Sequence, residues 1–498
     1  MLNPNRTPVQ NHKSDLIKGA VWAIAMRWSV RGIGLISTAI LARFLQPQDY
    51  GIVSMAFLVV GLVDTFLNKG AGEALVRLGR QATIDQINSA WTLRGLQGCV
   101  MAIVLAAVSP LAAIYFHEPR IVSVLLVVST CQAFMGFSNI GMALAFRDLQ
   151  FSVEFRQVLY SKITSVTITL LAAFYFRDYR GLVCGIVGGF VSEWLLSYHF
   201  HPYRPRWCTN RISDIWAISK WLLVTGVGSF FLRKTDQLMA GRVGNTQQYG
   251  LYTVGADIGL LPAGELGPTL TRPLFPILSA MQNDWESAKA ATLKTLGSVN
   301  SITMPLGFGL AAVSDQATLV LLGNPWKDAT PFVAGFAIIG VVQYLTGPLS
   351  TLLSVAGHVR VQSRIVWIEF LTFIAMALFL ISTYHLQGLM FARIGSGLLQ
   401  AVLMMYAART YTKISLRNTL NTLLRPLSGS LVMYGLLATS GHAFIHPMVN
   451  LVCSVMLGTL SYVAWLLLTW HLAGRPEGLE TTAIQLIRNR FHHIFHKQ

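Results

Sequence analysis

Five basic residues lie within long apolar segments of this 498-residue chain. Arg27 and Arg31 are four positions apart, which places them on one face of a helix. The others are Arg233, Lys234 and Arg393. A charge at the centre of a bilayer costs at least ~2.5 to 3.5 kcal/mol, so such residues usually face a protein interior or water. Cations gathered there would bind an anion such as a pyrophosphate, whose oxygens an Arg side chain can contact through two hydrogen bonds.

Acidic residues occur in the same apolar segments and leave two interpretations open. They are Asp64, Glu193, Asp236, Asp257 and Glu369. Asp236 follows Arg233 at the spacing of an intrahelical ion pair, so the cations could be neutralised locally. Alternatively, the acids could pair with the other arginines or bind a coupling proton or sodium ion.

The segments that carry these charges have the composition of membrane helices. The chain is 12% charged and 53% hydrophobic, whereas a soluble domain is about 25% charged. Apolar runs near the ~20 residues needed to cross a bilayer recur from end to end. We therefore expect an all-α integral membrane protein with about fourteen transmembrane helices and no soluble domain between them. The expected helices span residues 16–42, 51–68, 91–115, 121–145, 157–176, 181–200, 215–241, 250–267, 295–322, 331–356, 364–384, 386–408, 424–442 and 447–471.

Basic residues are distributed unevenly among the connecting loops, and this predicts the orientation. Lys and Arg are retained on the cytoplasmic side of membrane proteins. With the N-terminus inside, most of the 38 Lys and Arg residues fall in cytoplasmic segments, which predicts that both termini are cytoplasmic. The net charge of +17 is then mostly a consequence of topology, and nucleic-acid binding is not expected. The opposite loops hold Arg43, Arg120, Arg177, Arg180, Arg242 and Lys327.

The two halves of the chain are related by an internal repeat. An ungapped offset of 199 residues aligns Tyr50-Gly51 with Tyr249-Gly250. Even numbers of crossings preserve direction, so the repeats are parallel, an arrangement typical of transporters. We expect six-helix bundles at 1–200 and 201–410, two further helices at 411–471, and a basic amphipathic cytoplasmic tail at 472–498. The other aligned pairs are Ser14 with Ser213, Asp15 with Asp214, Trp22 with Trp221, Arg43 with Arg242, and Gln48 with Gln247.

Signatures of enzymes and metal sites are absent or weak. The chain has neither the GxxxxGK[ST] phosphate loop nor the HExxH motif. His199 and His201 could bind a metal, but no acidic or Cys ligands accompany them at a diagnostic spacing. We expect no catalytic residue, no metal and no cofactor. Gly185, Gly188 and Gly189 are expected to allow close helix contact.

Several sequence blocks, taken in order, resemble the polysaccharide-transporter branch of the multidrug/oligosaccharidyl-lipid/polysaccharide (MOP) flippase superfamily, especially exopolysaccharide exporters of the colanic acid and xanthan type. Within RKTDQLMAGRVG, the residues Arg233, Asp236 and Arg242 match the family's Arg-x-x-Asp and Gly-Arg pattern, whereas Lys234 has no counterpart in it. The blocks are LARFLQPQDYG (41–51), LAFRDLQF (144–151), RKTDQLMAGRVG (233–244), YGLY (249–252), FPILSAMQND (275–284) and LLGNPWKDATPF (321–332).

The resemblance implies a flippase of the bacterial inner membrane. Its cargo would be an undecaprenyl-pyrophosphate-linked oligosaccharide repeat unit, moved from the cytoplasmic to the periplasmic leaflet for exopolysaccharide synthesis. The cargo would cross by alternating access through a cationic central cavity, with a proton or sodium gradient as a possible driving force. Implied partners, besides membrane lipids, are a periplasm-facing polymerase and chain-length or export proteins.

Three other functions compete with this prediction. A cation-coupled multidrug antiporter of the same superfamily should have an acidic, aromatic cavity, which the basic residues here disfavour. A membrane-embedded polymerase or ligase should carry a long outer loop, but every expected outer loop is short. A non-transporting component of a polysaccharide assembly complex remains an alternative.

Overall fold

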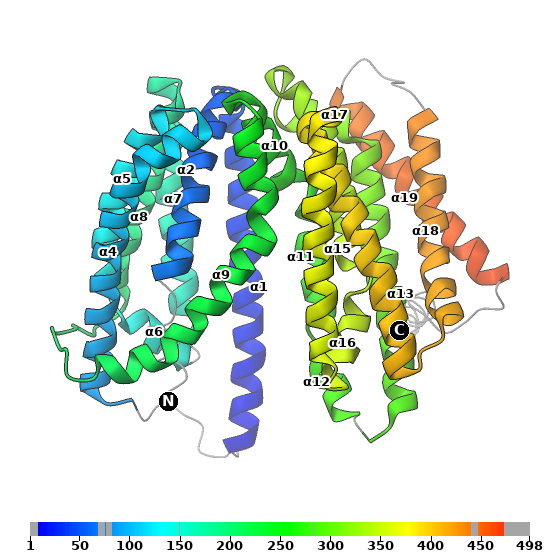
Figure 1. The fold of residues 1–498 in the computed structure, drawn as a ribbon, viewed down its shortest axis with the longest axis horizontal. Helices are drawn as coiled ribbons and strands as arrows, with labels where there is room; N and C mark the ends of the chain where they lie inside the picture. Colours follow the sequence, from blue (N-terminus) through cyan, green and yellow to red (C-terminus); the bar gives the residue numbers. More distant parts are fainter. Residues whose placement is uncertain are drawn as a thin grey trace, which may run out of the picture. The chain divides into compact units, whose positions relative to one another are not determined.

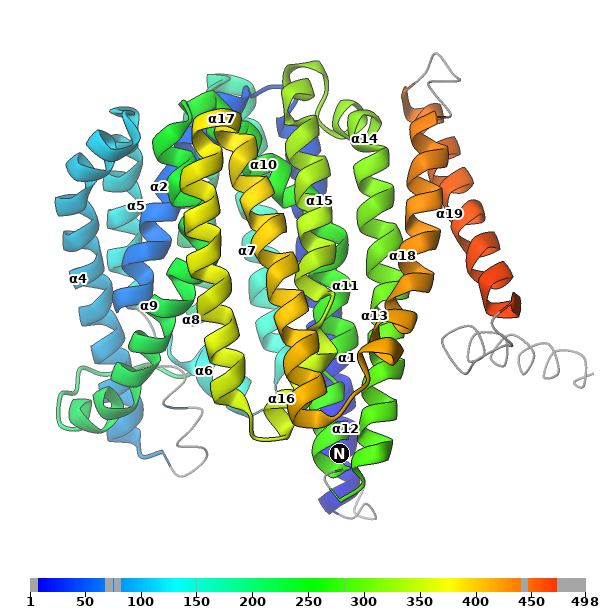
Figure 2. The same cartoon turned by 45° about the vertical axis from the view of Figure 1, so that its right-hand side comes forward.

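A computed structural model of the chain describes residues 8–67, 75, 82–148, 150–281, 283–439 and 447–472. Every regular element in these ranges is a helix, which confirms the predicted all-α class. The chain divides into two compact units, Met1–Gly250 and Leu251–Gln498. Their helices can be followed in Figure 1 and, after a rotation, in Figure 2.

The described part of the first unit consists mainly of long helices. The helix α9 belongs to this unit because it packs against α2 and α4. The sequence repeat places a boundary after residue 200, so the repeat boundary and the limit of the compact unit are different features of the chain. The helices are α1 (Pro8–Leu41), α2 (Pro47–Leu67), α4 (Ile84–Phe116), α5 (Arg120–Gly136), α6 (Gly141–Arg147), α7 (Phe151–Phe176), α8 (Tyr179–Phe200), α9 (Ile212–Val243) and the start of α10 (Thr246–Gly259).

Small residues let α7 and α8 pack closely. A side chain at Gly185 would overlap the hydroxyl of Thr169 on the facing helix. Across the same contact, the Ser165 hydroxyl donates to the carbonyl oxygen of Gly185 at 2.8 Å, and the Ser161 hydroxyl donates to that of Gly189 at 3.0 Å. The predicted role of these glycines in helix contact is confirmed. Small residues at helix contacts are typical of membrane proteins, where they bring backbones together and hydroxyls bridge them.

In the part of the chain that the structure describes, the second unit is built from α10 after Gly250 and nine further α-helices with two short helical segments. Leu349 and Leu352 of α16 lie in its core, where both are fully buried. The helices are α11 (Leu261–Thr271), α12 (Leu274–Ala280), α13 (Trp285–Ala312), α14 (Ser314–Leu321), η2 (Asn324–Ala329), α15 (Thr330–Tyr344), α16 (Gly347–Val355), α17 (Val359–Ala407), η3 (Ala408–Thr412), α18 (Leu416–Thr439) and α19 (Pro447–Leu472).

Several expected spans are interrupted helices. The pair α5 and α6 covers the segment expected at 121–145 but bends by 65°, and α13 and α14 bend by 74°. A break also occurs inside α17 at His385, whose φ of 48° and ψ of −131° are not helical. This break lies between the helices expected at 364–384 and 386–408, as the sequence predicts.

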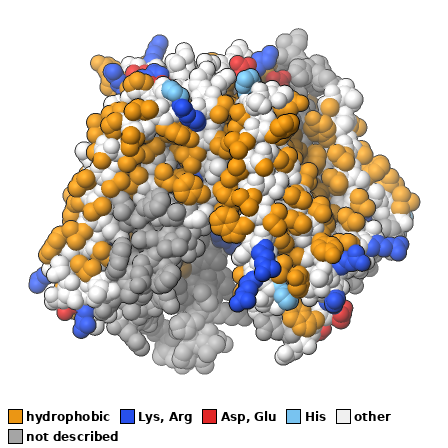
Figure 3. Space-filling view, viewed as in Figure 1, with side chains coloured by type: hydrophobic (Ala, Val, Ile, Leu, Met, Phe, Trp, Pro, Cys, Tyr) orange, Lys and Arg blue, Asp and Glu red, His pale blue; other side chains and the backbone are white. Residues whose placement is uncertain are grey.

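The described helices have the length and composition of membrane spans. Six of them are long and apolar enough to cross a bilayer, and the number rises to eight if each bent pair is one span. Hydrophobic side chains predominate over the middle of the coloured parts of the face shown in Figure 3, while most Lys and Arg lie toward its upper and lower ends. The protein is therefore a multi-pass membrane protein. The count of fourteen spans stays a prediction, and the amphipathic tail lies outside the described residues.

Candidate functional site

Helix α2 and helix α10, both of which start within the first unit, begin with the same cap. The backbone N–H of Gln46 donates to the Asp49 carboxylate at 2.9 Å, and the backbone N–H of Asn245 donates to the Gln248 side chain at 3.1 Å. Such a bond satisfies an amide that the helix itself leaves without a partner. Gln46 and Asn245 are 199 positions apart, and so are Asp49 and Gln248. The internal repeat is thus visible as equivalent hydrogen bonds.

The two capped helices meet at a pair of glycines. A side chain at Gly51 would overlap the carbonyl oxygen of Thr246, and one at Gly250 would overlap that of Pro47. Pro47 and Thr246 are themselves repeat equivalents, so each helix presents the same glycine to the same position of the other. This reciprocal contact has local two-fold symmetry. Glycine is needed at both positions because the backbones approach too closely for a Cβ atom.

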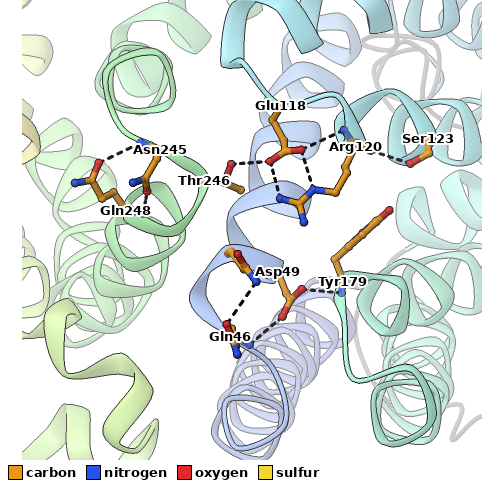
Figure 4. A network of polar contacts seen from close by, with 10 residues as sticks. Gln46, Asp49, Glu118, Arg120, Ser123, Tyr179, Asn245, Thr246 and Gln248 are labelled. Carbon is orange, nitrogen blue, oxygen red and sulfur yellow. Dashed lines mark hydrogen bonds and ion pairs between the residues drawn. The ribbon is translucent and has the colours of Figure 1, made fainter.

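Polar side chains tie the neighbouring turns to these helix starts (Figure 4). Arg120 contacts both carboxylate oxygens of Glu118 at 2.8 Å, and the Thr246 hydroxyl donates to Glu118 at 2.8 Å. The hydrogen bonds from Arg120, with the further one from Thr246, hold the pKa of Glu118 below its ordinary value. Asp49 also accepts a bond from the backbone N–H of Tyr179 at 3.0 Å. Four turns of the first unit therefore meet at one end.

Arg242, near the end of α9, makes further contacts at this end of the first unit. Its guanidinium group lies 5.7 Å from the centre of the Tyr115 ring and donates to the Tyr115 carbonyl oxygen at 3.1 Å. The same nitrogen lies 2.8 Å from the Nδ1 atom of His117. Arg242 matches the Gly-Arg pattern found in the sequence, and here it fastens the end of α9 to the end of α4. This geometry favours a structural role for Arg242.

The sequence-predicted cations of the first unit lie on α1 and α9. Arg27 and Arg31 are on α1, and both side chains are half-buried. On α9, the Arg233 side chain is exposed, whereas Lys234 is half-buried and donates to the Gln237 side chain at 2.9 Å. Asp236 is buried beside them. Two long helices of one unit thus carry four of the five expected basic residues.

Two of the predicted acids have basic partners. Glu193 on α8 interacts electrostatically with Arg94 on α4. On α17, Glu369 interacts with Arg393, whose guanidinium group lies 5.1 Å from the centre of the Phe373 ring. These interactions favour charge pairing for Glu193 and Glu369, and the choice between pairing and ion coupling remains a prediction. Sequence reasoning missed Arg94 as a partner because it lies 99 positions before Glu193.

Asp64 and Asp257, two further acids predicted from the sequence, lie on different helices. Asp64 is half-buried on α2, and Asp257 is exposed on α10. Asp257, Glu369 and Arg393 belong to the second unit, and the other predicted site residues belong to the first. A cavity that both units share remains a prediction. Among the described residues, no group of three or more His, Cys, Asp and Glu side chains could hold a metal ion.

Comparison with known proteins places the chain in a family. The family described as polysaccharide biosynthesis protein matches residues 40–331, more than half of the chain. The chain belongs to this family. It is a member of the polysaccharide-transporter branch of the MOP flippase superfamily, as the sequence blocks predict. Proteins similar to it include the succinoglycan biosynthesis transport protein ExoT of Rhizobium meliloti, which is 21% identical over 67% of this chain and 67% of that protein.

Curated relatives cover most of the chain at low identity. The lipopolysaccharide biosynthesis protein WzxC of Escherichia coli is 21% identical over 71% of this chain and 72% of that protein. The teichuronic acid biosynthesis protein TuaB of Bacillus subtilis is 20% identical over 90% of this chain and 94% of that protein. The likeness to TuaB therefore extends over nearly all of both chains.

Solved structures show the same fold. The lipid II flippase MurJ, in an inward closed conformation, superposes with a TM-score of 0.72 and 15% identity, covering 92% of this chain and all of that chain. An inward-facing multidrug resistance MATE transporter of the MOP superfamily superposes with a TM-score of 0.57 and 11% identity, covering 78% of this chain and 98% of that chain. The MOP-type flippase fold expected from the sequence is confirmed.

Proposed function

We propose that this protein is a flippase that moves an undecaprenyl-pyrophosphate-linked oligosaccharide repeat unit from the cytoplasmic to the periplasmic leaflet of a bacterial inner membrane. The observation that carries the proposal is the pair Arg27 and Arg31, half-buried on one face of the long helix α1 in a member of a polysaccharide biosynthesis family. Relatives named for lipopolysaccharide and succinoglycan biosynthesis support it.

The cargo's chemistry explains why basic residues are needed. A sugar-pyrophosphate headgroup is too polar to cross hydrocarbon unaided, because its charges and hydroxyls would lose their hydrogen bonds with water. Arg side chains in a hydrated path replace part of that solvation, and they suit phosphate oxygens because the guanidinium group donates two parallel hydrogen bonds. The polyprenyl tail stays in lipid throughout. No covalent bond is made or broken.

In the proposed cycle, the two halves of the transporter rock, and Arg27, Arg31 and Arg233 are exposed to each side of the membrane in turn. Lys234 and Arg393 would add positive charge along the path. The acids of the apolar segments would bind a coupling proton or sodium ion or pair with the basic residues; they are Asp64, Glu193, Asp236, Asp257 and Glu369. Both termini are cytoplasmic in this proposal.

The MATE-like fold makes a drug antiporter the second candidate. Its cargo would be an organic cation, which basic residues repel. A reconstitution experiment separates the two functions: purified protein in proteoliposomes is given either a fluorescent undecaprenyl-pyrophosphate oligosaccharide or an organic dye cation. Lipid translocation without dye transport supports the proposal. Dye transport driven by a cation gradient, without lipid translocation, would overturn it, and neither activity would indicate a non-transporting component.

A further inference from the structure

The segment that joins α8 to α9, residues 201–211, is held along the start of α4. Asn88 of α4 accepts from the Tyr203 hydroxyl at 2.8 Å and from the backbone N–H of Arg206 at 3.0 Å. Thr92 accepts from the backbone N–H of Cys208 at 3.0 Å. We call residues 201–211 the α8–α9 segment. In Figure 1 it is the green trace beside the lower end of α4.

Further bonds fix the first half of this segment. The Asn139 amide donates to the carbonyl oxygens of His201 and Tyr203, at 3.2 and 2.8 Å. Arg204 folds back to donate to the Tyr198 carbonyl oxygen at 3.0 Å and lies over the Tyr198 ring. The backbone of the α8–α9 segment is therefore positioned before any ligand arrives, so binding costs little ordering entropy.

The α8–α9 segment presents a basic and aromatic surface. The Arg206 side chain is exposed, and Trp207 is 59% exposed even though its ring makes an edge contact with Trp91 at 6.5 Å. No acid occurs between Glu193 and Asp214 in the sequence. Asp148, which interacts electrostatically with His201, is paired with Arg147 at 3.1 Å. The segment carries Arg204, Arg206 and Arg211 against the single acid Asp85 in the first turn of α4, so basic residues outnumber acidic ones there.

We propose that Arg206 and Trp207 form a binding site for the headgroup of an anionic phospholipid. The site lies between the start of α9 and the end of α8, a helix long and apolar enough to cross a bilayer, at the end of the first unit away from the network of Figure 4. Trp prefers the interfacial level of a bilayer, where its ring contacts acyl chains and its N–H meets the headgroups. Arg206 supplies the charge that selects an anionic headgroup over a zwitterionic one. This inference does not depend on the cargo that the protein moves.

Quenching of Trp207 fluorescence by brominated lipids tests the site in the full-length protein. Because the chain has 12 Trp residues, the Trp207 signal is obtained as the difference between wild type and Trp207→Phe. We expect brominated phosphatidylglycerol to quench this component at lower concentrations than brominated phosphatidylcholine. Arg206→Gln should raise the half-maximal phosphatidylglycerol concentration roughly fivefold, as expected for the loss of one basic residue near the surface.

Arg180→Gln is the matched control, because it removes an exposed Arg from the other end of the same unit. It should leave the quenching unchanged. Native mass spectrometry of bound phosphatidylglycerol in wild type and Arg206→Gln gives a second readout that needs no Trp variant, and the variant should retain fewer lipids. Equal quenching by the two lipids in wild type, or equal effects of Arg206→Gln and Arg180→Gln, would overturn the proposal.

Discussion

Gly51 and Gly250 lie against each other's helix at equivalent positions of the internal repeat. A Cβ atom built at Gly250 would lie 3.1 Å from the backbone nitrogen of Gly51 and would overlap the carbonyl oxygen of Pro47. The same overlap occurs between Gly51 and the carbonyl oxygen of Thr246. The duplication seen in the sequence has therefore kept a contact that depends on the absence of two side chains.

Replacing either glycine should destabilise the first unit. We expect Gly51→Ala and Gly250→Ala to lower the free energy of unfolding by about 1 to 3 kcal/mol, as overpacking typically does. Gly34→Ala is the control, since a Cβ there meets no atom within 4 Å, and Ala favours a helix over Gly. The measurement is denaturant unfolding in detergent. A Gly250→Ala variant as stable as Gly34→Ala would contradict the close contact.

Removal of the Asp49 carboxylate should lower the free energy of unfolding more than removal of the Gln48 side-chain amide. Asp49 is 5% exposed and accepts bonds from the backbone N–H groups of Gln46 and Tyr179. Asp49→Ala leaves both donors without this partner, so we expect a loss of about 1 to 3 kcal/mol. Gln48→Ala, at the same turn, removes one weak exposed bond and should change little. Similar unfolding midpoints for the two variants would argue against the cap.

Stability should decrease in acid through Glu118. Its pKa is below the ordinary value of 4.5 in the folded protein, so the unfolded chain takes up the proton first as the pH falls. The stabilisation, about 1 kcal/mol for a partly exposed pair, is complete above about pH 4.5 and disappears as the pH falls through the lowered folded pKa. Thermal unfolding followed from pH 7 downward should show this slope.

Glu118→Gln should flatten that slope because the amide does not titrate. The exposed Glu286, paired with Lys289 in the second unit, offers a control in Glu286→Gln, which should leave the profile unchanged. If the stability of wild type and of Glu118→Gln fell in parallel below pH 4.5, the proposed contribution of Glu118 to acid sensitivity would be contradicted.

Glu193 should act with Arg94 as a structural pair. We expect Glu193→Gln to lower stability by about 1 to 3 kcal/mol, between the values for exposed and buried ion pairs. A double-mutant cycle with Arg94→Gln should give a coupling energy clearly different from zero. Transport per folded molecule should stay near the wild-type value. Loss of gradient-driven transport in a stable Glu193→Gln variant would instead identify Glu193 as a coupling site.

Most of the fold can be predicted from the sequence, because membrane helices are recognised by their apolar composition and their length. The break at His385 falls between two expected helices, and the glycines of α8 contact α7 as expected. The bends of α5–α6 and α13–α14 were not predicted. Apolar composition continues through a bend, so hydropathy alone cannot locate it.

The site was harder to predict because its contacts connect distant positions. Arg94 and Glu193 carry no mutual sequence signal, and a charge pattern within one helix does not show what the next helix presents. The contact between Gly51 and Gly250 had a signal, namely their alignment at an offset of 199 residues. That alignment identifies equivalent positions, but it does not show that the equivalent positions touch.

Transport by arginine variants tests the central claim most directly. Wild type, Arg27→Ala, Arg31→Ala and the control Arg180→Ala are reconstituted into proteoliposomes, and translocation of a labelled undecaprenyl-pyrophosphate oligosaccharide is measured after insertion and folding are verified. We predict that wild type and Arg180→Ala move the lipid, whereas Arg27→Ala and Arg31→Ala each lose at least about tenfold in rate, the effect of one charge-assisted hydrogen bond. Folded Arg27→Ala and Arg31→Ala variants that match wild type would contradict the cationic path.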